Sequence, residues 1–390
     1  MSKKKDAKLI YAQSSDIKAR TYIEYRKDMK KKAIAELEIK EWLENKLKEE
    51  LGRKDIVVEK YGGDKFLWFL RAGGITREPD FVAYVGEKEK LFVEFQYADK
   101  EDLQYFDFKI SKVAKKKRGE RGKRIPYDDR VFLYILKNSL RYAFIEPKWI
   151  VEHGEIGVVD AWGSRPAYRV PKEDFESILK SDESLKPFVE TIDAKITILD
   201  FQHQLISIWE DELSKELQKV VDEEKLVKIV PKTLEGFFKV CFILDHLNKI
   251  PENTSLWLVY LLSYVNNKLT LRDIAMLTYS LDFLYAKIPP GQIKQNELRE
   301  LEGKLRKLIK LIDSYYDNKE SLYRSSIEES PLEETRYALF SINLIEDIIQ
   351  DAIHYHNANL TPITKIYQNV KNLKKIAEII TSYKRSKTIK

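Results

Sequence analysis

The stretch "REPDFVAYVGEKEKLFVEFQYADK", residues 77–100, decides the fold of the N-terminal half of the chain. Its two apolar runs, "DFVAYV" and "KLFVEFQ", are rich in the β-branched and aromatic residues that favour strands. Only the polar link "GEKE" separates these runs, and a link of two to five residues predicts an antiparallel hairpin. In that hairpin we expect Asp80 to lie opposite residue 94, 95 or 96.

Two carboxylates of this hairpin are predicted to meet at one end of the sheet. Side chains alternate between the two faces of a strand, so Glu94 and Gln96 share one face, and Val93 and Phe95 share the other. Asp80 can therefore approach Glu94. Two neighbouring carboxylates repel each other unless one is protonated or a cation lies between them. Oxygen ligands from carboxylates and water suit Mg²⁺ or Mn²⁺.

The sequence on either side of the hairpin predicts an α/β domain. Residues 33–51 are strong helix formers and end against Gly52, which is a typical helix stop. The segment "DLQYFDFKISKVAKKKRGERGKR", residues 102–124, predicts a helix that runs into a basic loop. Further short runs predict strands, because they are β-branched or aromatic and are bounded by turn residues: "DIVVEKYGG", "KFLWFLR", "RVFLYILK", "IGVVDAW" and "AYRV".

The strand signals stop after residue 172. The segments that follow are long and apolar at helical spacing, and "IPENTS" and "IPPGQ" break them, since proline cannot continue a helix. We therefore expect a basic N-terminal segment over residues 1–30, a mixed sheet flanked by helices over residues 31–172, and an all-helical domain over residues 173–390.

The hairpin resembles the signature of the PD-(D/E)XK nuclease superfamily, in which a Pro-Asp enters one strand and an acidic-X-Lys follows on the next. Pro79-Asp80 matches the first part, and Glu94-Phe95-Gln96 matches the second with Gln in the lysine position. The order of elements from about residue 33 to residue 137 is also similar to that core. The resemblance covers at most the first 170 residues and implies a restriction-endonuclease-like fold for them.

The resemblance implies roles for the residues of the motif. Asp80 and Glu94 would be metal ligands, with the Phe95 carbonyl as a third ligand, and the metal would be Mg²⁺ or Mn²⁺. Gln96 would contact the attacking water or the scissile phosphate. An amide can neither act as a base nor supply positive charge. We therefore expect the positive charge to come from the following helix.

A lysine and a glutamate outside the hairpin complete the predicted site. Lys109 or Lys112 would supply the positive charge, because both lie on the segment that follows the hairpin. Many members of the superfamily also place a glutamate of the first helix near the metal. Glu41 lies 11 residues before Gly52, a spacing similar to that in archaeal Holliday-junction resolvases of the superfamily, so the resemblance implies Glu41, with Glu38, one turn earlier, as the second choice.

A basic run follows the predicted site and is a candidate for phosphate contacts, which would make DNA affinity depend steeply on salt. The first 170 residues hold 38 Lys and Arg against 29 Asp and Glu, a net charge of +9, whereas residues 171–390 carry −3. A polyanion is therefore expected to bind the first half. The candidate residues are Lys112, Lys115, Lys116, Lys117, Arg118, Arg121, Lys123 and Arg124.

Composition sets the class of protein. A single cysteine excludes a disulfide framework and a cysteine-rich zinc site. No stretch of about 18 uncharged apolar residues occurs, so we expect a soluble cytoplasmic protein with no membrane partner. Charged residues make up 34% of the chain and there are only three Met, a composition that resembles proteins from hot environments.

These expectations favour a Mg²⁺- or Mn²⁺-dependent DNA endonuclease whose helical domain recognises the substrate or forms a homodimer. The alternative is a catalytically weakened nuclease-like module that binds nucleic acid or a DNA-bound protein, and Gln96 is the residue that favours it. In a third interpretation the helical half mediates protein assembly and dominates the function.

Overall fold

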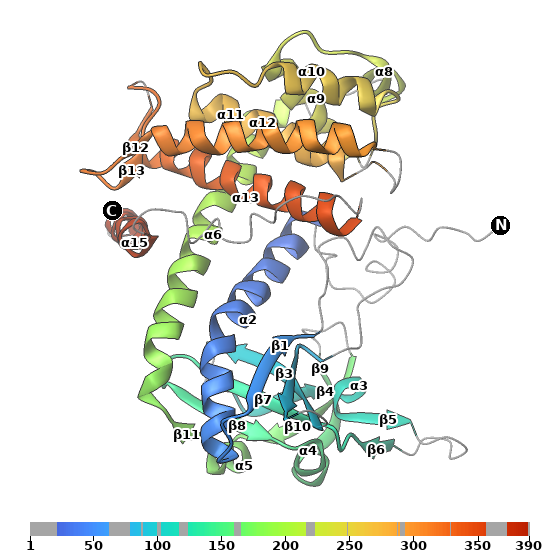
Figure 1. Cartoon of the computed structure of the whole chain (residues 1–390), viewed down its shortest axis with the longest axis vertical. Coiled ribbons are helices and arrows are strands. Elements are labelled where there is room, and N and C mark those ends of the chain that lie inside the picture. Colours follow the sequence, from blue (N-terminus) through green and yellow to red (C-terminus); the bar gives the residue numbers. More distant parts are fainter. Residues whose placement is uncertain are drawn as a thin grey trace, which may run out of the picture. The chain divides into compact units, whose positions relative to one another are not determined.

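The computed structural model describes residues 22–61, 79–86, 89–99, 103–116, 124–159, 165–215, 223–247, 249–286, 288, 293–327, 329–355 and 373–388. The chain divides into two compact units, residues 1–193 and 194–390 (Figure 1). The division falls within helix α6 (Lys186–Glu212), so the short elements that follow residue 172 belong to the first unit. Among the described residues, no helix has both the length and the apolar character needed to cross a membrane.

Six of the described strands of the first unit form a mixed sheet, ordered β1-β2-β3-β7-β8-β11. The neighbours β3 and β7 are parallel, and the other described neighbours are antiparallel. Helices flank this sheet, as the sequence predicts (Figure 1). The strands are β1 (Ile56–Lys60), β2 (Phe81–Val85), β3 (Glu89–Ala98), β7 (Arg130–Leu136), β8 (Arg141–Ile145) and β11 (Lys180–Ser181).

The predicted antiparallel hairpin of β2 and β3 is confirmed, and its register selects one of the three partners left open for Asp80. Phe81 pairs with Val93, so Asp80, the residue before β2, lies opposite Glu94. Gly86 has φ 68° at the end of β2, a left-handed conformation that glycine adopts without the penalty of a Cβ atom. Beyond Val93 the strand β3 continues beside β7, where Glu94 pairs with Phe132. The structure thus confirms that the two carboxylates meet at one end of the β2–β3 pair.

A second, three-stranded antiparallel sheet packs against the first. It is ordered β4-β10-β9. One buried cluster joins side chains of both sheets, among them Phe108 of the second sheet and Phe132 of the first, whose ring centroids are 5.4 Å apart. Its strands and the small elements beside them are β4 (Tyr105–Lys109), β9 (Glu155–Val159), β10 (Arg165–Pro171), α3 (Ile110–Val113), β5 (Ala114–Lys116), β6 (Arg124–Pro126), α4 (Pro147–His153) and α5 (Lys172–Ser177).

The prediction of a helix over residues 102–124 is wrong. The described part of this segment forms β4, the single turn α3, and the paired strands β5 and β6. Phe106 and Phe108 are buried, whereas Tyr105 and Lys109 are exposed, and this period of two is that of a strand. The predicted strand "KFLWFLR", residues 65–71, lies outside the described residues.

Helix α2 (Tyr22–Glu50) packs on the sheet next to β1. It begins earlier than the sequence predicts and ends as predicted before Gly52, which has φ 61°. Ile39, Leu43 and Leu47 are buried at a spacing of about one turn, which fixes the rotation of the helix against the sheet. Residues one to two turns nearer its N-terminus are therefore held in fixed positions beside β1 and β2.

The second unit is a helical assembly, which confirms the predicted helical character of the C-terminal region. Helix α11 is buried along its whole length and packs against α9 and α13, with a short β12–β13 hairpin beside α13. The described elements are α8 (Glu223–Lys228), α9 (Leu234–His246), α10 (Thr254–Ser263), α11 (Leu271–Tyr285), α12 (Gln295–Ser314), β12 (Tyr316–Asp317), β13 (Leu322–Tyr323), α13 (Pro331–Tyr355) and α15 (Leu373–Thr388).

Candidate functional site

Asp80 lies where β2 begins, and its side chain, rather than a backbone group of β2, pairs with the backbone of Phe95. Its side chain is buried, and its Oδ2 accepts a hydrogen bond of 2.8 Å from the Phe95 backbone N–H. A buried backbone N–H requires an acceptor, and a carboxylate is a strong one. The other oxygen, Oδ1, lies 2.8 Å from the Nζ of Lys32 on α2. Asp80 is therefore held on both sides.

Glu94 lies on β3 and is 4% exposed. Its Oε2 lies 2.9 Å from the Nζ of Lys112 on α3, and its Oε1 accepts a hydrogen bond of 3.1 Å from Nη1 of Arg130. Arg130 is the first residue of β7, so the parallel pairing of β3 with β7 brings it beside Glu94. Its guanidinium also stacks over the Tyr127 ring, 3.6 Å from the centroid.

A third buried carboxylate, Glu36, comes from α2. It is 5% exposed and its Oε2 lies 2.8 Å from the Nζ of Lys60, the last residue of β1. Its Oε1 lies 3.4 Å from the Nζ of Lys32, the same amine that contacts Asp80. Lys32 thus links the carboxylates of Glu36 and Asp80 across two elements of the first unit.

The three carboxylates share one electrostatic environment. Burial raises the pKa of Glu94 to about 7, with Lys112 opposing and the negative charge of Asp80 adding to the shift. Burial also raises the pKa of Glu36, with Lys60 opposing and Asp80 again adding. Asp80 therefore acts on both glutamates. Ammonium and guanidinium groups contact these carboxylates, and the pKa values of both glutamates are nevertheless raised. Additional positive charge would therefore stabilise the ionised carboxylates.

The donor set fits a hard divalent cation that is held by two carboxylates together with water and substrate phosphates. Among the described residues, no group of three or more His, Cys, Asp or Glu is arranged to hold a metal ion. Mg²⁺, however, is often held by only one or two carboxylates together with water and substrate phosphates. Asp80 and Glu94 offer such a pair. The N–H and C=O of a strand residue point to the same neighbour, so the Phe95 carbonyl also faces the side of Asp80.

The structure brings some of the predicted residues together and separates others. Gln96 lies on the same face of β3 as Glu94 and is half-buried. Lys112 contacts Glu94, whereas Lys109 is exposed at the end of β4. On the first helix, Glu41 is exposed and Glu38 is half-buried. Among the side chains of that helix that the structure describes, the buried glutamate is Glu36, not Glu41 or Glu38.

Sequence reasoning missed Glu36, Lys32, Lys60 and Arg130. A signal for Glu36 was present, because it lies three and seven residues before the buried Ile39 and Leu43, in line with the apolar stripe of the helix. A glutamate in such a stripe requires buried partners. The other three residues carried no signal, since they reach the site only through tertiary contacts.

The basic run is described in part. Lys115 and Lys116 are exposed on β5, and Arg124 is half-buried on β6, its antiparallel neighbour. Lys115 Nζ lies 5.8 Å from the centroid of the Tyr127 ring, the ring that also stacks under Arg130. The β5–β6 pair therefore connects the run to the carboxylates. The remaining predicted residues, Lys117, Arg118, Arg121 and Lys123, lie outside the described residues.

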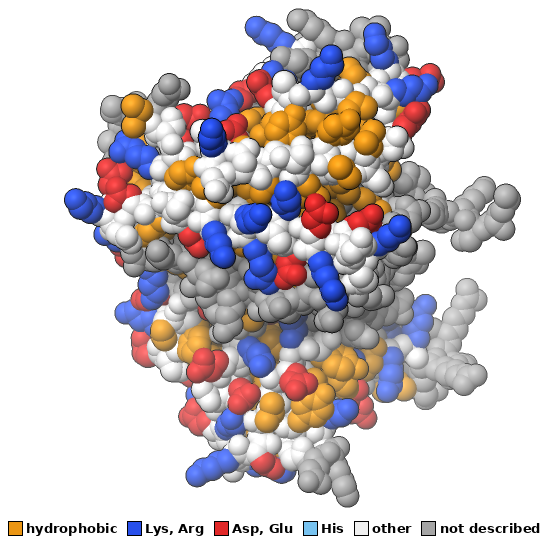
Figure 2. All heavy atoms as spheres, turned by 45° about the horizontal axis from the view of Figure 1, so that its top comes forward, with side chains coloured by type: hydrophobic (Ala, Val, Ile, Leu, Met, Phe, Trp, Pro, Cys, Tyr) orange, Lys and Arg blue, Asp and Glu red, His pale blue; other side chains and the backbone are white. Residues whose placement is uncertain are grey.

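Charges of both signs cover the face of the molecule drawn in Figure 2. There the coloured Lys and Arg side chains are interspersed with Asp and Glu side chains. Comparisons of the chain with protein-family models, curated proteins and solved structures find no significant match. The chemistry of the site is therefore the guide to function.

Proposed function

We propose that the first unit is a metal-dependent DNA endonuclease with a restriction-endonuclease-like fold of the PD-(D/E)XK type. One observation carries this proposal: Asp80 lies opposite Glu94, and both are buried where β2 begins and β3 continues beside the parallel strand β7. A buried glutamate from the first helix, Glu36, lies close enough to feel the charge of Asp80. Buried, mutually repelling carboxylates with perturbed pKa values are typical of catalytic sites.

The residues divide the work of phosphodiester hydrolysis. Asp80, Glu94 and the Phe95 carbonyl would hold Mg²⁺ or Mn²⁺. When bound, the ion supplies a water of lowered pKa and offsets the negative charge that develops on the phosphate. Gln96, on the face of Glu94, would orient that water through its amide. Attack of the water oxygen on phosphorus would form one P–O bond and break the bond to the departing 3′ oxygen, while the water releases a proton to solvent and the 3′ oxygen takes one up from solvent.

The neighbouring elements would hold the DNA. The exposed Lys115 and Lys116 on β5 would contact backbone phosphates, which position a duplex without reading its sequence. The helical second unit would recognise the substrate or form a homodimer. A positively charged hairpin beside a carboxylate site suits a substrate that is a polyanion and is cut at a phosphate.

A second candidate function is a nuclease-like binding module that does not cut. The observation that favours it is the pairing of the carboxylates with Lys32, Lys60 and Lys112, which neutralises them in part without a metal. Gln96 in the lysine position favours it as well. Such a module would dock on nucleic acid or on a DNA-bound protein through the basic hairpin.

A cleavage panel tests the proposal. Purified protein is incubated with labelled duplex, single-stranded and branched DNAs and RNAs, each with Mg²⁺, Mn²⁺ or EDTA. We expect products from DNA that require the metal and that disappear in Asp80→Asn. Binding without products under every metal condition would support the module instead and overturn the enzyme.

A further inference from the structure

The sequence motif lacks a positive charge at residue 96, and the structure offers two replacements near Glu94. An amide at this position carries no charge, so a phosphate that enters the site needs a cation from another element. Among the described residues, Lys112 and Arg130 contact Glu94, at 2.9 and 3.1 Å. To contact a substrate, Lys112 or Arg130 must leave the Glu94 carboxylate.

Arg130 is fixed in place. Its side chain is 8% exposed, and it starts a central strand of the sheet. Its guanidinium stacks on Tyr127 at 3.6 Å from the ring centroid and donates a hydrogen bond of 3.4 Å to the backbone carbonyl of Lys112. A planar guanidinium with this many partners keeps its position. Arg130 therefore supports Glu94 and the backbone of α3, and it is a positioning residue.

Lys112 can change its partner. Its side chain is 21% exposed, and it lies on α3, a single helical turn of four residues that leads into the basic hairpin. An ammonium on a flexible four-carbon stem reorients easily. Lys32 contacts Asp80 and Glu36, at 2.8 and 3.4 Å, rather than Glu94. Lys112 is the cation at this site that best combines contact with Glu94 and a path towards solvent.

A divalent cation at Asp80 and Glu94 would repel an ammonium that contacts Glu94. Like charges a few ångströms apart in a site that excludes water interact strongly. A phosphate bound next to the metal offers the nearest negative charge to replace Glu94. A counter-ion of the carboxylate then becomes a counter-ion of the phosphate.

We propose that Lys112 supplies the positive charge that the motif lacks at residue 96. Lys112 contacts Glu94 while the carboxylates are free of metal. When metal and DNA bind, it contacts a non-bridging oxygen of the scissile phosphate instead. This inference rests on the proposed function. It assigns to the crossover between β3 and β7 a catalytic residue that the superfamily motif places on β3 itself.

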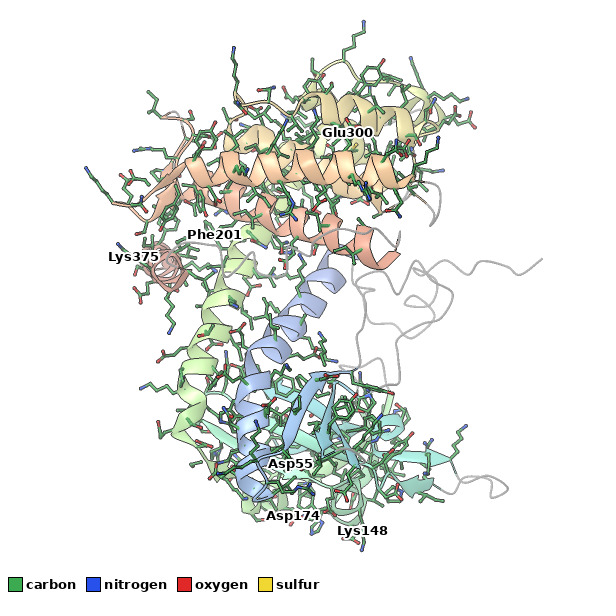
Figure 3. All side chains as sticks on the ribbon, in the orientation of Figure 1. Asp55, Lys148, Asp174, Phe201, Glu300 and Lys375 are labelled. Carbon is green, nitrogen blue, oxygen red and sulfur yellow. The ribbon has the colours of Figure 1, made fainter. Side chains whose placement is uncertain are left out.

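The test measures metal affinity and cleavage separately. Lys112→Gln removes the charge at similar length, and Lys148→Gln is the matched control, because Lys148 is 75% exposed on α4 (Figure 3). Mn²⁺ binding is measured without DNA by titration calorimetry, and cleavage by single-turnover kinetics on a duplex. We expect Lys112→Gln to bind Mn²⁺ several-fold more tightly than wild type, since a competing cation is gone, and to cleave about 100-fold more slowly. Lys148→Gln is expected to match wild type in both.

The opposite signs of the two effects separate this role from a structural one. If Lys112 merely held Glu94 in position, Lys112→Gln would weaken Mn²⁺ binding and slow cleavage together, which would overturn the inference while leaving the proposed function intact. Lys112→Arg keeps the charge and is expected to restore Mn²⁺ affinity to the wild-type value and to recover part of the cleavage rate. A wild-type protein that binds no Mn²⁺ and cuts no DNA would overturn both proposals.

Discussion

The substitution Glu94→Gln is expected to stabilise the metal-free protein, although it removes a contact of Lys112 and of Arg130. Glu94 is 4% exposed, and burial together with Asp80 raises its pKa from the ordinary 4.5 to about 7. That difference corresponds to about 3 kcal/mol, at about 1.4 kcal/mol per pKa unit, by which the folded state disfavours the ionised form. Gln has nearly the same shape and carries no charge, but its single amide oxygen can accept from only one of the two cationic partners, and more weakly than a carboxylate does. We expect a net gain of about 1–3 kcal/mol.

The sign of the pH dependence follows from which state holds the proton. Between pH 4.5 and about 7 the unfolded chain has released the Glu94 proton, whereas the folded protein still binds it. The wild-type protein therefore loses stability as the pH rises through this window and keeps the full loss above it. The advantage of Glu94→Gln should be near zero at pH 4.5, grow up to about pH 7, and stay constant at higher pH.

Native-state hydrogen exchange of the β3 and β7 amides measures this gain in the first unit by itself. The measurement is made in EDTA at several pH values for wild type, Glu94→Gln and the control Glu59→Gln. Glu59 is exposed on β1, so its variant should stay within about 0.5 kcal/mol of wild type. A Glu94→Gln protein that is less stable at every pH, or whose gain does not grow with pH, would refute the reasoning that the site is strained by charge.

Other substitutions in the first unit are expected to change cleavage, Mn²⁺ binding or DNA affinity. Asp80→Asn keeps an oxygen for the Phe95 N–H but removes a ligand charge, so cleavage should fall by orders of magnitude and Mn²⁺ should no longer raise the melting temperature. Glu36→Gln should weaken Mn²⁺ binding, because Glu36 is buried beside the site. Glu41→Gln should leave Mn²⁺ binding unchanged, because Glu41 is exposed. Equal effects of the two variants in calorimetry would exclude Glu36 from the site. Replacing Lys115 and Lys116 by Ala should flatten the dependence of DNA affinity on salt. If both residues contact phosphates, the slope of log affinity against log salt concentration should become smaller in magnitude by about 1.8. An unchanged slope would make them solvated surface residues.

The hairpin could be predicted from sequence because its information is local. Two alternating apolar runs and a short polar link predict the hairpin and limit Asp80 to three partners, of which the structure selects Glu94. The first helix was predictable for the same reason, up to its stop at Gly52. Its rotation was not, since counting back from the stop led to Glu41, whereas packing of Ile39 and Leu43 on the sheet turns Glu36 towards Asp80.

The crossover between β3 and β7 shows where local reasoning fails. The segment from residue 102 was predicted to be a helix that runs into a basic loop, but the buried alternation of Phe106 and Phe108 with exposed neighbours makes its first part a strand of a second sheet. Packing against Phe132 then outweighs the helical propensity of the residues that follow. That choice also shapes the site, because a single turn after β4 brings Lys112 to Glu94 and leaves Lys109 exposed.

The buried charges around the start of β2 are difficult to explain as a device for stability. Replacing a buried group of ions by apolar residues of similar volume is often neutral or stabilising, so packing gives no reason to gather Glu36, Asp80 and Glu94 from α2, the start of β2 and β3. A pure scaffold would gain from losing them. An enzyme must keep them, because the repulsion that weakens the metal-free fold is the attraction that binds a cation. Stability that rises while metal binding and cleavage vanish, in the same Glu94→Gln protein, is therefore the combination of results that distinguishes a catalytic site from a binding module.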